Sequence, residues 1–184
     1  GSDALAAGSG AAASGNRSSA LGAASVASAT GATAIGADAS ARGDNSTVIG
    51  RSASTNATNG VAIGNGAFAS NGAGSIAIGA GAGVSGAGSV ALGAGARAVE
   101  ANVVSVGGGN GTDGPATRRI VNVAAGRIAA GSTDAVTGGQ LNTTNQRVGA
   151  VETRVGDIDE RIGSVETVTA NALSYDDASR DKVT

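Results

Sequence analysis

The sequence predicts a mainly β head followed by an α-helical stalk, with the head built as a parallel β-solenoid. Glycine returns almost every 14 residues through the first half of the chain. A short alternation of bulkier and smaller residues precedes each of these glycines. Towards the C-terminus the apolar period changes to the heptad of a coiled coil. A fixed period indicates stacked copies of one small unit rather than a single wide core.

The repeat unit is defined by glycines spaced 14 residues apart, with one step of 15. They are Gly8, Gly22, Gly36, Gly50, Gly64, Gly79, Gly93 and Gly107. Each unit offers two short strands, one ending just before the glycine and one centred four residues after it. We expect the glycine at a tight corner and Asn or Gly at the second corner. The extra residue of the longer step should bulge near Ala73.

The two faces of the first strand differ in size. The residue just before each glycine is large, as in Ile35 and Ile49, whereas the residue two before is usually alanine, as in Ala34. We expect the first strand to turn its large groups into a narrow interior and the second strand to add alanines. The alanine two before the glycine would then face outward. We favour an interface between chains there over a simple exposed alanine, because the heptad segment that follows requires oligomerisation.

Composition excludes several classes of protein. The chain has 184 residues, including 33 Gly, one Pro and two aromatics, Phe68 and Tyr175. It has no Cys, which excludes disulfides and thiolate metal sites. The net charge of −2 gives no basis for binding nucleic acid or an anionic membrane surface. No apolar run is long enough for a transmembrane helix.

Catalytic constellations are also missing from the sequence. There is no His, and the one Lys is Lys182, so no serine has a base nearby. The Gly-rich stretch 79–88 lacks the Gly-Lys-Ser/Thr of a phosphate loop. The repeats hold only Asp3, Asp38 and Asp44, too few for a calcium-binding roll. We therefore expect no enzyme activity, no catalytic residue, no cofactor and no metal.

The heptad pattern covers residues 134–173 and opens with a credible helix start, Ser132 or Thr133 before Asp134. Its core positions are mostly β-branched, which favours trimers or tetramers over dimers. The predicted core residues are Leu141, Thr144, Val148, Val151, Val155, Ile158, Ile162, Val165, Thr169 and Ala172.

Charged residues flank this core in a regular order. Each arginine lies five residues before an acid, the spacing that pairs neighbouring parallel helices in register. The predicted interhelical pairs are Arg147 with Glu152, Arg154 with Asp159 and Arg161 with Glu166. An antiparallel arrangement would place like charges together. The alternative is the solvated face of a single helix.

One short motif has a known adhesive meaning. Arg42-Gly43-Asp44 falls at a predicted corner, where it could present a guanidinium and a carboxylate to an integrin-type receptor. The alternative is a turn that happens to contain this triplet.

The segment after the repeats carries a further pattern. Arg118 to Gly126 reads RRIVNVAAG, followed by Thr133 to Val136, TDAV, and by Gln140-Leu141. These residues resemble the neck of trimeric autotransporter adhesins, the YadA-like family, and units such as Ser75 to Gly79 resemble its head repeat. One departure is the stretch from Arg127 to Gly131, which lengthens the connection between the two halves of the neck.

The resemblance implies a left-handed parallel β-roll head that trimerises, a neck that passes each chain to its neighbour, and a parallel three-stranded coiled coil. We expect the YadA-like head at residues 1–107, the neck and linker at 108–133, the trimeric stalk at 134–173, and the start of a further connector at 174–184. Family members reach the bacterial surface through an outer-membrane barrel, an anchor that we expect to be absent from this fragment.

The resemblance also implies a function. We expect a non-enzymatic cell-surface adhesin fragment that is an obligate homotrimer and attaches multivalently to host extracellular matrix or cells, without direct membrane contact in this fragment. The alternative is a purely structural spacer whose adhesive site lies elsewhere in the full-length protein.

Overall fold

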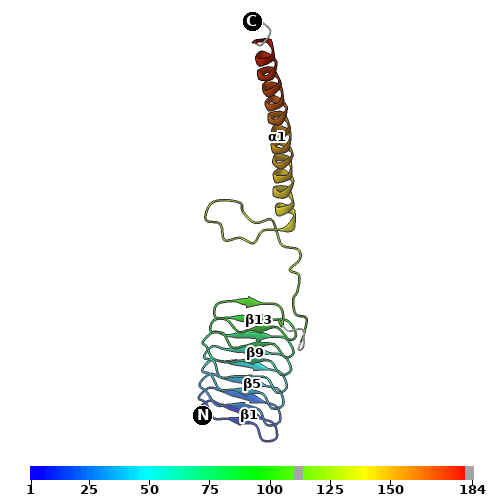
Figure 1. The fold of residues 1–184 in the computed structure, drawn as a ribbon. Helices are drawn as coiled ribbons and strands as arrows, with labels where there is room; N and C mark the ends of the chain where they lie inside the picture. Colours follow the sequence, from blue (N-terminus) through cyan, green and yellow to red (C-terminus); the bar gives the residue numbers. More distant parts are fainter. Residues whose placement is uncertain (110–113, 181–184) are drawn as a thin grey trace. The chain divides into compact units, whose positions relative to one another are not determined.

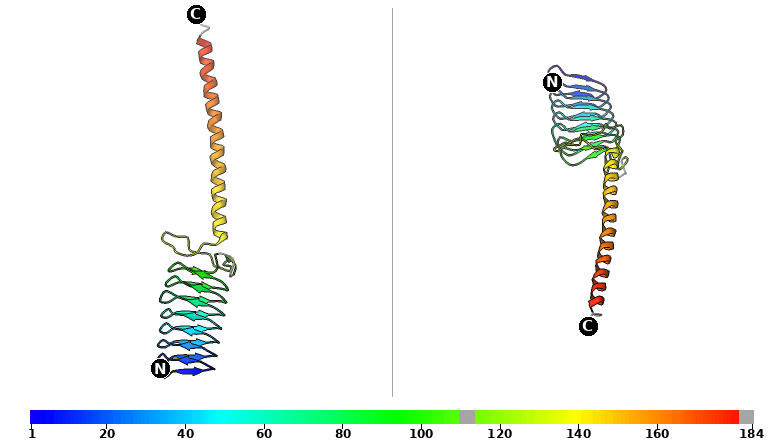
Figure 2. Two further views of the ribbon diagram at one scale, coloured as in Figure 1. Left: turned by 60° about the horizontal axis from the view of Figure 1, so that its bottom comes forward. Right: turned by 90° about the horizontal axis from the view of Figure 1, so that it is seen from above.

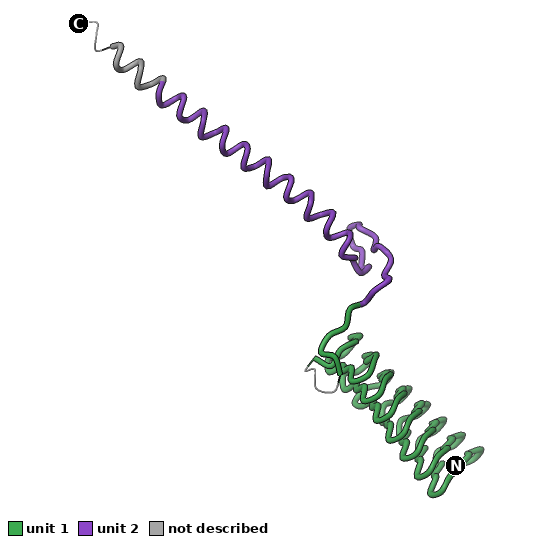
Figure 3. Tube along the Cα trace, turned by 90° about the vertical axis from the view of Figure 1, so that its right-hand side faces the viewer, with its two compact units in different colours: residues 1–119 green, residues 120–184 purple. Residues whose placement is uncertain are grey.

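The repeat region folds into a parallel β-solenoid, and the C-terminal region forms one long helix (Figures 1 and 2). The computed structural model describes residues 1–109 and 114–180, with side chains described to residue 171. It divides into two compact units, Gly1–Arg119 and Ile120–Thr184 (Figure 3).

Two parallel sheets make up the walls of the solenoid, and each turn contributes one strand to each sheet. The first sheet, here the odd-strand sheet, contains β1 (Leu5–Ala7), β3 (Ser19–Leu21), β5 (Thr33–Ile35), β7 (Thr47–Ile49), β9 (Val61–Ile63), β11 (Ile76–Ile78), β13 (Val90–Leu92) and β15 (Val104–Ser105). The second, the even-strand sheet, contains β2 (Ala12–Ala13), β4 (Val26–Ala27), β6 (Ser40–Ala41), β8 (Ser54–Thr55), β10 (Phe68–Ala69), β12 (Gly83–Val84) and β14 (Arg97–Ala98). The predicted parallel solenoid is confirmed.

The recurrent glycine lies where the backbones of successive turns approach most closely. Gly79 has φ +133°, and a Cβ built there would lie 2.4 Å from the carbonyl carbon of Gly93 in the next turn. Two residues later in the same corner, Gly81 has φ +65° and open space around its Cβ position. The predicted tight corner is therefore confirmed, and Gly79 is required by a steric constraint that Gly81 does not share.

The second corner also carries left-handed residues, as predicted from its Asn content. Asn45, Asn59 and Asn71 have φ values of 55°, 55° and 61°. Asn tolerates this region better than other side chains because its short polar group hydrogen-bonds locally.

The extra residue of the longer repeat is absorbed in this second corner. Ser54 pairs with Phe68 at a step of 14, whereas Phe68 pairs with Gly83 and Val61 with Ile76 at a step of 15. The Ser70 N–H donates to the Val84 carbonyl as Ser28 does to Ala41, and the Ser75 hydroxyl donates to Gly72 as Ser18 does to Gly15, so the added residue is Asn71, between Ser70 and Gly72. The predicted bulge near Ala73 is confirmed, and the strands on both sides keep their register.

The interior of the solenoid is much thinner than the sequence suggested. Within the described residues its buried apolar side chains are alanines, with Val48 and Val84 the only larger ones. In the six repeats between the first and the last, the residue two before the glycine points inward and is fully buried: Ala20, Ala34, Val48, Ala62, Ala77 and Ala91. The buried residues of the even-strand sheet complete the core: Ala27, Ala39, Ala41, Ala53, Ala67, Ala69, Ala82, Val84, Ala96 and Ala98.

The expected orientation of the first strand was therefore wrong. Ile35 and Ile49 lie outside with 36% and 38% of their surface exposed, and Ala34 lies inside. The physical reason is the width of the turn. The core between the sheets is filled by methyl-sized groups from both walls, so the large side chain must take the outer face.

The second unit contains an irregular segment and the helix α1 (Gly138–Arg180). Thr137 caps the helix, since its hydroxyl oxygen accepts from the Gln140 N–H at 3.4 Å. The start expected at Ser132 or Thr133 forms a turn instead, because Asp134 accepts from the Arg127 N–H at 2.9 Å and Ser132 accepts from the Asp134 N–H at 3.2 Å.

The glutamine of the Gln140-Leu141 motif fastens the irregular segment to the helix. The Gln140 side chain donates to the Gly126 carbonyl at 2.6 Å and accepts from the Gly126 N–H at 2.9 Å. These two bonds close the loop 126–140, including the added residues 127–131. No described helix combines the length and apolar character needed to cross a membrane.

The two glycines of one corner provide a test of the solenoid geometry. We expect Gly79→Ala to lower the free energy of unfolding by about 3 kcal/mol or more, because its Cβ would overlap backbone of the next turn. Gly81→Ala should cost about 1 kcal/mol, because Ala24 already occupies the equivalent left-handed position with φ 54°. Urea unfolding at matched protein concentration measures both. Equal losses in the two variants would contradict the proposed close approach.

Candidate functional site

The most extensive functional feature of the solenoid is a row of large apolar side chains on the outer face of the odd-strand sheet. These residues, here the apolar stripe, are Leu21, Ile35, Ile49, Ile63, Ile78 and Leu92. Four of them remain 36–50% exposed in the single chain. A contiguous exposed apolar surface of this kind is typical of protein interfaces. The alanines that were expected at an interface are buried inside the solenoid, and their large neighbours lie on the outer face instead, because the strand faces the other way.

The helix α1 exposes a second apolar row, which coincides with the predicted coiled-coil core. Side chains of this row are about half exposed: Leu141, Val148, Val151, Val155, Ile158, Ile162 and Val165 range from 49% to 65%. Thr144 and Thr169 are also exposed, and their hydroxyls donate to the carbonyls of Gln140 and Val165. The predicted core residue Ala172 lies outside the described side chains.

The charged residues border this row in the single chain. Arg147 and Glu152 line one shallow groove together with Val148 and Val151. Arg161 and Glu166 line another with Ile162. Among the described residues, none of the three predicted pairs forms an ion pair within the chain. The third pair is Arg154 with Asp159. Their role as interhelical pairs remains a prediction.

The Arg42-Gly43-Asp44 triplet lies at the second corner of a turn. Arg42 and Asp44 are exposed, while Gly43 is buried. A Cβ on Gly43 would lie 2.0 Å from the Ala57 carbonyl oxygen, so close stacking of turns accounts for the glycine. The Asp44 carboxylate accepts from the Thr30 N–H at 3.0 Å and bridges two turns. Arg42 and Asp44 are therefore accessible, and Gly43 is required by the stacking of turns. The adhesive role of the triplet remains a prediction.

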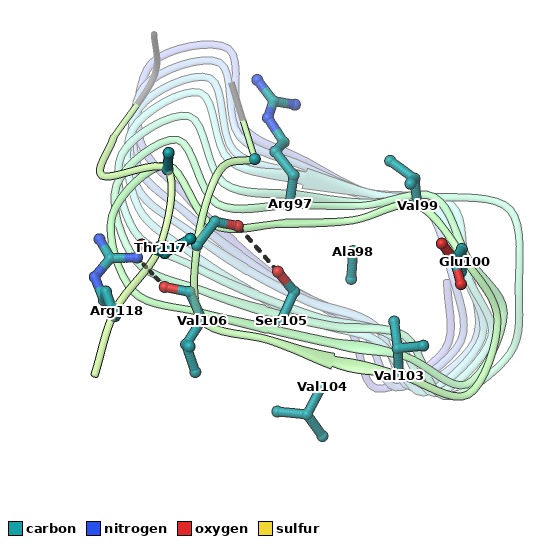
Figure 4. A pocket seen from close by; sticks show the side chains of 13 residues that line it. Arg97, Ala98, Val99, Glu100, Val103, Val104, Ser105, Val106, Thr117 and Arg118 are labelled. Atoms are coloured by element: carbon teal, nitrogen blue, oxygen red, sulfur yellow. Dashed lines mark hydrogen bonds between the residues drawn. The ribbon is translucent and has the colours of Figure 1, made fainter. Parts of the chain in front are cut away.

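A cavity of about 450 Å³ opens at the last turn of the solenoid (Figure 4). It is lined by core residues such as Ala98 and Val103 and by Arg118. The Arg118 guanidinium donates to the carbonyls of Val106 and Ala94, the second at 2.7 Å. Pro115 and Ala116 accept from Gly108 and Gly109 at 2.9 and 3.0 Å. This segment covers part of an otherwise open end of the sheets.

The cavity at the last turn has no arrangement for acid–base or nucleophilic chemistry. Its one carboxylate, Glu100, is exposed, and the chain contains no His or Cys. Within the described residues, no cluster of three metal-ligating side chains occurs. The arrangement suits the termination of a solenoid.

Sequence reasoning missed one side-chain pair on the even-strand sheet. The Arg97 guanidinium carbon lies 5.0 Å from the centre of the Phe68 ring. The repeat spacing could have revealed this pair, because steps of 15 and 14 place Phe68, Gly83 and Arg97 in one column. Sequence reasoning also missed the bonds of Arg118 and Gln140, which depend on irregular backbone.

Two family models match the chain. The model of the YadA head domain repeat matches residues 1–25, 13–39, 27–53, 41–67 and 69–110. The model of the coiled stalk of trimeric autotransporter adhesin matches residues 119–158.

Among the solved structures similar to this chain is the crystal structure of the collagen-binding domain of Yersinia adhesin YadA. The two share 28% sequence identity with a TM-score of 0.45, over 79% of this chain and 99% of that one. No curated protein sequence matches the chain significantly. The head-repeat matches cover more than half of the chain and the stalk match follows them, so the chain belongs to the YadA-like family of trimeric autotransporter adhesins.

Proposed function

We propose that this chain is the exposed part of a bacterial surface adhesin that acts as an obligate homotrimer and attaches to host extracellular matrix or host cells. It comprises a head at residues 1–107, a neck at 108–133 and a trimeric stalk at 134–173, with a connector starting at 174. Residues 181–184 of that connector lie outside the described residues.

The observation that carries the proposal is the exposure of apolar side chains along both units. The apolar stripe of the solenoid and the helix row together leave eleven large side chains at least 36% exposed in the single chain. Burying such surface is worth about 25 cal/mol per Å², so association with further copies stabilises the fold. Each solenoid interior, filled mainly by alanine, supplies little of this free energy alone.

The composition of the helix row supports three parallel strands. β-Branched residues at both core positions, such as Val148 and Val151, disfavour the two-stranded form. Arg161 and Glu166 line one groove, and in a parallel register each would meet the opposite charge of a neighbouring helix. Each exposed pair contributes about 0.2–1 kcal/mol, so their main effect is to select orientation.

A rigid trimer is suited to adhesion because it presents three copies of every surface site. Individually weak contacts then combine, since the second and third contacts form at a high effective concentration. Family membership supports adhesion and surface exposure, and the chain offers no catalytic constellation that would favour an enzyme.

A structural spacer is the second candidate function. It is favoured by the role of the Arg-Gly-Asp corner in stacking turns, since Gly43 and Asp44 both contact neighbouring turns. In that case the adhesive site would lie elsewhere in the full-length protein.

The proposed trimer can be tested by introducing a carboxylate either into the apolar row of the helix or on its opposite face. We expect wild-type protein to sediment at three times the chain mass of 17.0 kDa. Ile158→Asp should shift it to smaller species, because a carboxylate in the core cannot be solvated. Thr153→Asp adds the same charge on the outer face and should leave the trimer intact. A folded wild-type monomer at micromolar concentration would refute the proposal.

Adhesion is tested by a binding screen of the trimer against collagen, fibronectin, laminin and host cells. Saturable binding to any of them supports an adhesin, whereas no binding across the panel supports the spacer.

A test of receptor binding by the Arg-Gly-Asp triplet requires a variant that preserves the fold. Asp44→Asn keeps an oxygen that accepts from Thr30 but removes the carboxylate charge. If the triplet binds an integrin-type receptor, this variant should lose at least tenfold in cell attachment, with Asp38→Asn as the control. Unchanged attachment would show that the triplet is only a turn.

A further inference from the structure

We propose that the outer face of the even-strand sheet binds an anionic sugar through Phe68 and Arg42. This inference rests on the proposed function, because it names the chemistry of a ligand for the same adhesive head. The two side chains line a cavity of about 260 Å³ together with Ser54, Asn56 and Ser70.

The Phe68 ring is held in place from one side. It leans over Gly83 in the next turn, where a Cβ would lie 2.3 Å from the ring carbon Cζ. The Arg97 guanidinium of the following turn packs on it at 5.0 Å from the ring centre. The glycine thus provides the space that lets a half-buried aromatic ring lie along the sheet.

The cavity lies on the other side of the ring. Its lining comes from the turns of β6, β8 and β10, and neither Gly83 nor Arg97 contributes to it. One side of the Phe68 ring thus packs against Arg97, and the other side faces the accessible cavity that Arg42 also lines. Phe68 is the one aromatic residue among the side chains that the structure describes.

The donors that the cavity offers to a ligand come from Arg42 and Asn56, because the Thr55 and Ser70 hydroxyls already donate to the Ala69 and Val84 carbonyls. The exposed Arg42 side chain makes no ion pair with any described carboxylate, and no carboxylate lines the cavity. The Asn56 side-chain oxygen accepts from the Asn71 N–H at 3.4 Å, which leaves its amide N–H groups for a ligand. A guanidinium and an amide nitrogen with no carboxylate beside them favour a ligand that carries negative charge and several acceptor oxygens.

A pyranose that carries a carboxylate or a sulfate has both required features. One face of such a ring consists of C–H groups that can lie on Phe68, and its anionic group can accept paired bonds from Arg42. The cavity is slightly smaller than the roughly 300–1,000 Å³ of sites for drug-sized ligands, which suits one or two sugar units. Sulfated glycosaminoglycans and sialylated glycans share this chemistry.

The position of the cavity is compatible with a trimer. The apolar stripe lies on the odd-strand sheet, whereas the cavity lies on the outer face of the even-strand sheet. Association through the stripe would leave three cavities accessible, so a weak single site could give firm attachment to a repetitive glycan.

The test measures binding of the purified trimer to heparin oligosaccharides, to desulfated heparin and to sialyllactose at about 0.05 and 0.15 M salt. We expect binding to at least one of these sugars. Arg42→Ala and Phe68→Ala should each weaken it at least tenfold, and Arg42→Lys should recover part of the loss. Binding that requires sulfate identifies a glycosaminoglycan, and binding to sialyllactose identifies a sialylated glycan.

Matched controls separate the cavity from general charge and stability. Arg51→Ala removes an arginine at the other corner, and Val26→Ala trims the same column three turns away from Phe68. Both controls should bind like wild type, and Asp44→Asn should also leave sugar binding unchanged. Thermal unfolding of every variant confirms that the solenoid remains folded.

Three results would overturn the inference. They are absence of sugar binding, equal weakening by Arg51→Ala, or binding of an acidic peptide such as polyglutamate in place of the sugars. If the trimer attaches to matrix proteins or cells and both cavity variants attach equally well, the sugar site fails while the proposed function stands. If the trimer attaches to nothing, the proposed function fails as well.

Discussion

The narrow gap between the two sheets governs the rest of this structure. Each turn of 14 residues closes through two corners that hold left-handed residues, and the recurrent glycines let successive backbones stack without side chains between them. The space left inside accepts methyl groups and an occasional valine. A larger inner side chain would force the walls apart along the whole stack, because every turn is bonded to its neighbours.

This constraint explains why the large side chains lie outside. A parallel strand has two faces, and when the inner face admits only alanine the apolar residues needed for stability must take the outer one. Ile35 and Ile49 are therefore both the most hydrophobic groups of their turns and accessible from outside. The helix follows the same principle, with its apolar row left for neighbouring chains. In the proposed trimer, these two outer rows are the apolar surface that association would bury.

Much of the fold could be predicted from the sequence because it depends on periodicity. The glycine spacing located the strands and corners, and the step of 15 indicated a bulge near Ala73, two residues from the added Asn71. Periodicity could not predict which face of the first strand points into the interior. Alternation shows that Ala34 and Ile35 face opposite sides, but the rule that large groups lie inside fails when the turn is this narrow. Contacts that cross turns, such as Phe68 with Arg97, become visible only when the columns are aligned. The bonds of Gln140 to Gly126 arise from irregular backbone, for which the sequence has no period.

The corner that contains Ala73 has a wider consequence for how such heads diversify. One residue is added there, yet the strands before and after it keep their partners. Insertions at this edge are therefore nearly neutral for the stack, since lengthening a surface loop costs little conformational entropy. The same edge can accept longer loops in related heads without any change to the interior. New binding surfaces can therefore arise along this edge while the strands and core stay the same.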